Sequence, residues 1–476
     1  MNSAKKKSTI SNLFWSFLTQ GGIEVIRFIV AIILARLLVP ADYGIIAIIG
    51  IFTGFSNVFI QFTFSPVIVQ NRDLDAKDIY TIFWLNLLVG AFVATFFVLS
   101  GSFLAQFYHQ PVLKGLVTLA GLQVLVASIT VVQRALQEKN HNFKTIGLVR
   151  FVAALLSSIV AITLAYNNFG VWALGINMFL LVLFECLGLF VLSKWYPKLV
   201  FSANTFQKIK RMTASLVLER SFGHLTESMD KFILGKFSSI SDLGLYSRSY
   251  GFLLFPLRNI SQVISQVMLP KVSENKHKLK HIKILYTNSL NMILLIIFPL
   301  MLMVFMIPDA VVYLIFGDKW MGMVPYLKIL SSCGILSSMI VLSQSFFVGY
   351  GDHKRLNRIT LIEKPLFATM ILCGFFVNGS IGLTYGILVA SILAVLLRQY
   401  YIFKILGINL ISQNIVFFKC SLISVLFFFI YNYLILDKSN YGLAFLLFSV
   451  FLFIYFSVSF LLKKGFMKSL KKLNEI

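Results

Sequence analysis

The sequence predicts an all-α polytopic membrane protein with about fourteen transmembrane helices. Three observations support this fold class. Of the 476 residues, 58% are hydrophobic and 13% are charged, a composition that would leave a soluble domain with an apolar surface. The apolar residues fall into runs of about 20, the length of helix that crosses a bilayer. Lysine and arginine gather in alternate connections between these runs, which is the positive-inside pattern; only the connection before span thirteen, residues 407–414, is uninformative.

The first six predicted spans are apolar runs separated by short polar connections. The first run follows Lys5, Lys6 and Lys7, and it is too long for the hydrophobic region of a signal peptide, so we expect it to be retained as a membrane span. The six spans cover residues 13–38, 44–67, 79–103, 112–136, 145–166 and 170–193.

The seventh predicted span, residues 212–236, differs from the others because it is rich in ionisable side chains. A charged side chain at mid-membrane costs roughly 2.5–3.5 kcal/mol, so we expect this helix to line a hydrated cavity rather than face lipid. The remaining predicted spans are again apolar and cover residues 244–269, 282–307, 322–348, 359–377, 381–406, 415–436 and 441–462.

The distribution of basic residues predicts that both termini are cytoplasmic. Lysine and arginine concentrate in the N-terminal segment, in alternate connections and in the C-terminal tail, at residues 5–7, 72–77, 139–144, 194–211, 271–283, 354–358 and 463–472. The opposite connections are short and poor in them, at residues 108–114, 166–170, 315–320, 377–380 and 436–440. The net charge of +24 is therefore explained by the basic residues of the predicted cytoplasmic connections, and no nucleic acid is expected as a partner.

Two segments that lie six spans apart resemble each other. Residues 33–47 align with residues 233–247, and a second match joins residues 113–125 to 327–339. The offset preserves orientation, so we expect two six-helix lobes in a parallel pseudo-two-fold repeat around a central cavity, plus two extra C-terminal helices. The predicted divisions are 1–200 for spans 1–6, 201–410 for spans 7–12, and 411–476 for spans 13–14 and a basic cytoplasmic tail.

Each of the first two matching segments contains an aspartate and a glycine, at Asp42 and Gly44 and again at Asp242 and Gly244. We expect the aspartate to cap the helix that follows and the glycine to permit a tight turn.

Residues 21–47, 70–75, 229–250 and 269–273 resemble the lipopolysaccharide and polysaccharide (O-antigen) flippases of the Wzx/WzxC type, within the multidrug/oligosaccharidyl-lipid/polysaccharide (MOP) exporter superfamily. The resemblance implies a flippase that moves undecaprenyl-diphosphate-linked oligosaccharide units across the bacterial cytoplasmic (inner) membrane by alternating access, for O-antigen, capsule or exopolysaccharide synthesis. It implies as partners the lipid-linked oligosaccharide, membrane lipids, a polysaccharide polymerase and chain-length machinery.

Polar side chains at helical spacing in spans one, seven and eight are the predicted cavity lining. Arginine suits a diphosphate because its guanidinium stays charged and binds phosphate oxygens in bidentate fashion. The predicted substrate-binding cations are Arg27, Arg220, Lys231, Arg248 and Arg258. The predicted coupling or polar cavity groups are Gln20, Glu24, Glu219, His224, Glu227 and Asp230.

The spacing leaves structural roles open for some of these charges. Glu24 with Arg27, and Glu227 with Lys231, have the separation of ion pairs within one helix. Glu185 stands alone in span six and fits a buried structural glutamate as well as a functional one.

The sequence predicts neither an enzyme nor a bound cofactor. His224 by itself makes no metal site, and the chain contains no P-loop, G-x-S-x-G or H-E-x-x-H motif. The intramembrane carboxylates are candidates to bind a coupling H⁺ or Na⁺. Two alternatives stay open: a cation-coupled multidrug exporter of the same superfamily, against which the basic spans seven and eight argue, and a membrane polysaccharide polymerase, against which the short outward connections argue.

Overall fold

The computed structural model describes residues 22–24, 26–71, 73–193, 195–407, 441–442, 446, 448–452 and 455. All regular secondary structure in these residues is helical, as predicted. The chain divides into two compact units, Met1–Gly244 and Leu245–Ile476. Predicted span 13 and much of spans 1 and 14 lie outside the described residues, and the count of fourteen stays a prediction. The predicted lobes, 1–200 and 201–410, rest on a repeat and also stay a prediction.

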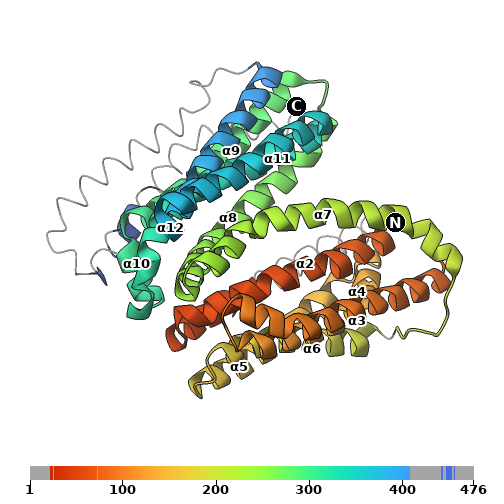
Figure 1. Ribbon diagram of the computed structural model, residues 1–476. Helices are drawn as coiled ribbons and strands as arrows, with labels where there is room; N and C mark the ends of the chain where they lie inside the picture. The colour runs from red at the N-terminus through yellow and green to blue at the C-terminus, as the bar shows by residue number, and fades with distance from the viewer. Residues whose placement is uncertain are drawn as a thin grey trace. The chain divides into compact units, whose positions relative to one another are not determined.

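Six helices of the first unit correspond to predicted spans two to seven (Figure 1). They are α2 (Pro40–Gln70), α3 (Ala76–Phe107), α4 (Leu113–Lys139), α5 (Phe143–Tyr166), α6 (Val171–Ser193) and α7 (Ala203–Phe237). Helix α4 packs against α2, α3 and α6, while α5 packs against α6 and α7 against α2. Helices α2 to α6 therefore form one bundle, and α7 packs along α2.

Residues 22–24 and 26–38 are the described part of the first predicted span, and all but Leu38 are helical. Their buried side chains Val30 and Leu34 pack against Ala161 of α5 and Ala173 of α6, in a cluster that also contains Leu174. Alanines at such a contact let helix backbones approach closely, which favours helix association in a membrane.

The second unit contains the greater part of α8 (Ile240–Glu274), followed by α9 (Leu279–Met306), α10 (Pro308–Ile315), a 3₁₀ helix (Asp318–Met323), α11 (Val324–Tyr350) and α12 (His353–Leu406). Helix α11 packs against α9 and α12. The short α10 and the 3₁₀ helix occupy the connection between predicted spans nine and ten, for which the sequence predicts only a loop.

Helix α12 is two helices joined by a break at Asn378 and Gly379. Asn378 has φ −149° and ψ 41°, and Gly379 has φ 54° and ψ −137°, a left-handed conformation that favours glycine. The break confirms the two predicted spans 359–377 and 381–406. The two arms then approach so closely that a β-carbon on Gly374 would lie 2.9 Å from the carbonyl carbon of Gly382.

Eight of the described helices are long and apolar enough to cross a membrane. Their outward faces carry exposed apolar side chains, such as Phe92, Leu99 and Phe103 of α3, which are 74%, 76% and 65% exposed. Such faces require lipid in place of water, and the chain is a multi-pass membrane protein. Helices α7 and α8 have the length of the others and are not among the eight; both carry several ionisable residues.

Of the two aspartates in the repeated segment, Asp42 caps its helix as predicted. Asp42 Oδ2 accepts a hydrogen bond from the backbone N–H of Val39, the N-cap residue of α2, at 3.2 Å. Asp242 Oδ2 accepts from the hydroxyl groups of Ser239 at 2.7 Å and Ser238 at 3.1 Å, just before α8. At the start of α8 it is Ser239 Oγ that accepts a backbone hydrogen bond, from the N–H of Asp242 at 3.0 Å, and Asp242 in turn holds the serine hydroxyls.

Candidate functional site

The ionisable residues of predicted span seven lie on α7 with different degrees of burial. Glu219, Arg220 and Glu227 are exposed, His224 is half-buried and Asp230 is buried. Helix α7 packs along α2, so the side chains on the face toward α2 are buried or half-buried, while those on the other face remain exposed. The predicted polar stripe is present, and it divides into an exposed part and a packed part.

His224 belongs to the packed part of α7. Its Nε2 lies 2.9 Å from the carbonyl oxygen of Ile51 in α2, and its ring centroid lies 6.3 Å from that of Phe55. Gly54 of α2 makes room for the ring, because a β-carbon there would lie 2.9 Å from Nε2. Within its own helix, His224 Nε2 is 3.3 Å from Ser228 Oγ. His224 therefore links α7 to α2.

Lys231 forms an ion pair with Asp230, at 3.9 Å between Nζ and Oδ1. Asp230 also accepts a hydrogen bond from the backbone N–H of Lys231 at 2.8 Å. The spacing had suggested Glu227 as the partner of Lys231; the structure instead pairs it with its sequence neighbour and leaves Glu227 exposed.

The predicted pair in the first span is present: Arg27 donates to Glu24 Oε1 at 3.2 Å. Both side chains remain partly exposed, at 45% and 37%. Gln20, predicted on the same stripe, lies outside the described residues.

In the second unit, Arg248 of α8 lies over the ring of Phe316, with Cζ 5.4 Å from the ring centroid. A neighbouring aromatic face is a stabilising environment for a guanidinium. The side chain of Arg258 lies outside the described residues.

A cavity of about 180 Å³ lies within the first unit, between α2, α4, α5 and α6. Its charged residues are Arg134 of α4, Arg150 of α5 and Glu185 of α6. Arg134 donates a hydrogen bond to Glu185 Oε1, and Arg150 Nε lies 3.7 Å from the same oxygen. Two guanidinium groups therefore share one carboxylate.

This cluster corrects the interpretation of Glu185, which is paired with two arginines and does not stand alone. Arg134 and Arg150 were missed, although both lie within predicted apolar spans. Three charged residues in three adjacent apolar spans are a signal in themselves, because each is costly in a bilayer unless it is compensated.

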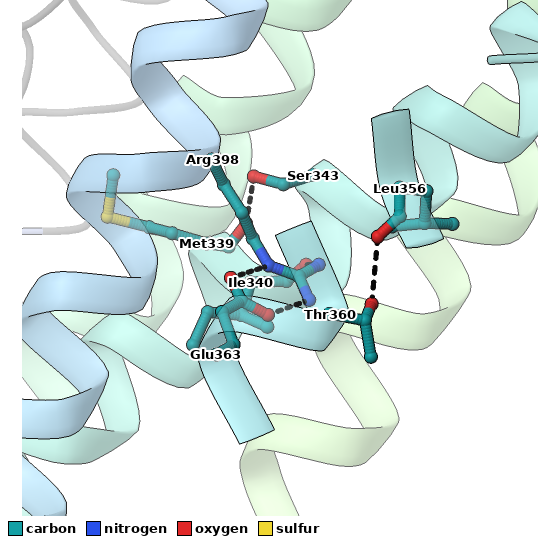
Figure 2. A network of polar contacts seen from close by, with 7 residues as sticks. All are labelled: Met339, Ile340, Ser343, Leu356, Thr360, Glu363 and Arg398. Atoms are coloured by element: carbon teal, nitrogen blue, oxygen red, sulfur yellow. Dashed lines mark hydrogen bonds and ion pairs between the residues drawn. The ribbon is translucent and has the colours of Figure 1, made fainter. Parts of the chain in front are cut away.

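A second buried ion pair was also missed, in the second unit. Arg398 donates from Nε and Nη2 to the two carboxylate oxygens of Glu363, each at 2.6 Å (Figure 2). The two residues lie on opposite arms of α12, and Nη1 of Arg398 also reaches the carbonyl oxygen of Ile340 in α11 at 3.4 Å. This bidentate pair connects three helical segments.

The chain matches, over residues 33–325, the model of a family described as "Polysaccharide biosynthesis protein". One relative is the teichuronic acid biosynthesis protein TuaB of Bacillus subtilis (strain 168), 23% identical over 69% of this chain and 69% of its own length. Another is the lipopolysaccharide biosynthesis protein WzxC of Escherichia coli (strain K12), 22% identical over 84% of this chain and 82% of its own.

Two solved structures share the fold. The lipid II flippase MurJ, in an inward closed conformation, matches with a TM-score of 0.73 and 14% identity, over 96% of this chain and 100% of MurJ. An inward-facing multidrug resistance transporter of the MATE family matches with a TM-score of 0.58 and 15% identity, over 82% and 95% of the two chains. This chain thus shares the fold of these two transporters, and the match over more than half of the sequence shows that it belongs to the polysaccharide biosynthesis protein family.

Proposed function

We propose that this protein is a flippase that moves lipid-diphosphate-linked oligosaccharide from the cytoplasmic to the outer leaflet by alternating access. Membership of the polysaccharide biosynthesis protein family supports this proposal. Further support comes from relatives named for teichuronic acid and lipopolysaccharide biosynthesis, and from the shared fold with a lipid II flippase.

The observation that carries the proposal is the exposed charge on α7. Glu219, Arg220 and Glu227 are exposed on a helix of membrane-spanning length within a membrane fold. Each would cost roughly 2.5–3.5 kcal/mol against lipid, so these side chains require a hydrated pathway. A charged headgroup with an attached glycan needs such a pathway to cross the apolar interior.

In this proposal the cations Arg27, Arg220, Lys231, Arg248 and Arg258 attract the diphosphate. The carboxylates Glu24, Glu219, Glu227 and Asp230 bind the coupling H⁺ or Na⁺, and no further cofactor is needed. Both termini are cytoplasmic and the membrane is the bacterial inner membrane, because the basic connections face the cytoplasm. The polymerase and the chain-length machinery receive the product.

Reconstitution provides the test of this function. The full-length protein is placed in proteoliposomes that contain undecaprenyl-diphosphate-linked oligosaccharide with a fluorescent sugar, and a membrane-impermeant quencher reports the leaflet. We expect the protected fraction to fall faster than in protein-free vesicles. Arg220→Gln is expected to slow this exchange, whereas Lys210→Gln, nearer the N-terminal end of α7, is not. Equal exchange with and without protein, under an imposed H⁺ or Na⁺ gradient, would exclude the proposed function.

The shared fold with a MATE-family transporter favours a second candidate, a cation-coupled multidrug exporter. The same vesicles distinguish the two candidates. An exporter would use the imposed H⁺ or Na⁺ gradient to transport a fluorescent cationic drug, and would leave the lipid-linked oligosaccharide in its original leaflet.

A further inference from the structure

The cavity of the first unit carries a net positive charge. Its charged lining consists of Arg134, Arg150 and Glu185, so two positive charges face one negative charge. Arg134 and Glu185 are the more buried members, with side chains 20% and 8% exposed, and they form the closer pair. Arg150 is 41% exposed and lies farther from the carboxylate, at 3.7 Å. Arg150 therefore supplies the cation that the protein itself compensates least.

Three carboxamide side chains line the same cavity: Asn57 and Gln61 of α2 and Gln123 of α4. Among the described residues, none of the three has a hydrogen-bond partner from the protein. Each amide offers two N–H donors and one carbonyl acceptor, so together they present a large unused hydrogen-bonding capacity. Such capacity suits a ligand with several hydroxyl groups.

Two threonines complete the polar lining. Thr53 donates its hydroxyl to the carbonyl oxygen of Ile49 at 3.0 Å, and Thr130 donates to that of Val126 at 2.9 Å. Both hydroxyl groups are thus occupied as donors and offer only lone pairs to the cavity. The lining as a whole provides donors from the amides and arginines, and acceptors from the threonines and amide oxygens.

Size and charge narrow the class of ligand. A volume of 180 Å³ is below the ~300–1,000 Å³ of sites for drug-sized molecules, so the cavity admits a single ring-sized group. A net charge of one matches a monoanion, whereas a diphosphate carries more than one negative charge and no hydroxyl ring. An uncompensated cation in a membrane interior is costly, which favours an anionic ligand.

We propose that this cavity binds one acidic sugar residue of the transported glycan, a hydroxylated ring that carries a single carboxylate. The proposal rests on the proposed function, because the lipid-linked glycan is the source of the sugar. Arg150 meets the carboxylate, the three amides hold the hydroxyl groups, and the Arg134–Glu185 pair positions Arg150. The cavity makes the protein selective for glycans that contain an acidic sugar.

The first test measures binding to the full-length protein in detergent by calorimetry and by thermal unfolding. The probes are free glucuronate, glucose and inorganic diphosphate. We expect glucuronate to bind about tenfold or more tightly than glucose, because a charge-assisted pair is worth roughly 1.5–3 kcal/mol. Arg150→Gln should remove this difference, and Arg150→Lys should restore part of it.

Two further variants separate binding from folding. Lys114→Gln removes one exposed positive charge at the start of α4, outside the cavity, and should leave glucuronate binding unchanged. Gln123→Ala removes one amide without touching the ion pairs, and should weaken glucose and glucuronate alike. If the Arg150→Gln variant does not fold, the Gln123→Ala variant tests the site by itself. Binding of glucose and glucuronate by Gln123→Ala at the wild-type affinity would then overturn the assignment of this cavity.

Other results would also overturn the proposal. These are equal affinity for glucose and glucuronate, no binding of glucuronate, or Arg150-dependent binding of inorganic diphosphate in preference to glucuronate, which would assign the cation to the lipid headgroup. The outcome is separable from the proposed function. Vesicles that move a neutral lipid-linked glycan while the protein binds no glucuronate would leave the flippase intact and remove this site.

Discussion

A β-carbon on Gly244 would lie 3.0 Å from the backbone nitrogen of Gly44, so the first turns of α8 and α2 touch through their backbones. The contact is reciprocal, because a β-carbon on Gly44 would lie 2.9 Å from the carbonyl carbon of Ile240. The sequence predicts that these glycines permit tight turns. Both instead lie in regular helix, and they permit a close crossing of two helices, which is a frequent use of glycine in membranes.

This crossing predicts a conformation-dependent crosslink between Tyr43 and Leu243, the residues that precede the two glycines. After replacement of the four native cysteines, Tyr43→Cys with Leu243→Cys should crosslink readily in the resting protein. Alternating access requires the crossing to open, so lipid-linked substrate or a coupling-ion gradient should reduce the yield, as measured by gel mobility. A yield that is the same under all conditions would argue against movement at this crossing.

A second prediction concerns Arg258, whose assignment comes from the sequence alone. Arg258→Ala should abolish transport in vesicles while the amount of folded protein in the membrane stays unchanged, because a headgroup ligand is lost. Arg258→Lys should recover only part of the rate, since an ammonium lacks the planar fork of donors. The exposed Arg358→Ala serves as the control, and wild-type transport by Arg258→Ala would remove this residue from the site.

A third prediction concerns the buried Arg398–Glu363 pair. Arg398→Ala leaves a carboxylate that is 11% exposed without its partner, and should destabilise the fold by about 3–5 kcal/mol. Arg398→Met with Glu363→Gln should recover much of this loss, because both charges are then absent. The control is Arg355→Ala, which breaks an exposed pair with Asp352 worth about 0–1 kcal/mol. Thermal unfolding in detergent measures all three; equal effects of Arg398→Ala and Arg355→Ala would contradict the prediction.

A fourth prediction concerns the connection between α6 and α7. The buried Asp78 of α3 accepts a hydrogen bond from Thr205 and lies 3.5 Å from Lys208 Nζ, at the start of α7. Asp78→Ala should release this segment, so trypsin should cut after Lys198 or Lys208 severalfold faster than in the wild type, as limited proteolysis detects. As a control, trypsin should cleave the Asp73→Ala variant, in which an exposed aspartate is removed, at the wild-type rate. An unchanged pattern for Asp78→Ala would show that other contacts hold the connection, such as Trp84 Nε1 with the carbonyl oxygen of Lys198.

A fifth prediction tests the topology. Lys278 lies between α8 and α9, and Asn168 between α5 and α6, each far from the middle of a helix. The loop charges place Lys278 in the cytoplasm and Asn168 outside. A membrane-impermeant maleimide applied to intact cells should therefore label a single cysteine at position 168 and leave one at position 278 unlabelled. Labelling of position 278 from outside would contradict the predicted orientation.

Much of the fold could be predicted from the sequence, because each membrane span is a run of about 20 consecutive apolar residues and needs no knowledge of distant parts of the chain. Helices α2 to α7 and α9 fall on predicted spans, and the break at Asn378 and Gly379 falls between two of them. The candidate site was less accessible to sequence reasoning. The ionisable residues of α7 could be recognised because they interrupt an apolar sequence, and the Glu24–Arg27 pair could be predicted from its spacing. The partner of Lys231 could not, because it depends on side-chain geometry.

The sequence by itself determined the fold class, the helical segments and the cap that Asp42 provides to α2, since each depends on residues within a few positions of one another. Only the tertiary structure decided which distant charges meet. Arg134, Arg150 and Glu185 are separated by 16 and 35 positions along the chain (150 − 134 and 185 − 150), and packing of α4, α5 and α6 brings them to one cavity. The same holds for Gly44 and Gly244, because the space a side chain would fill is set by a helix far away in the sequence.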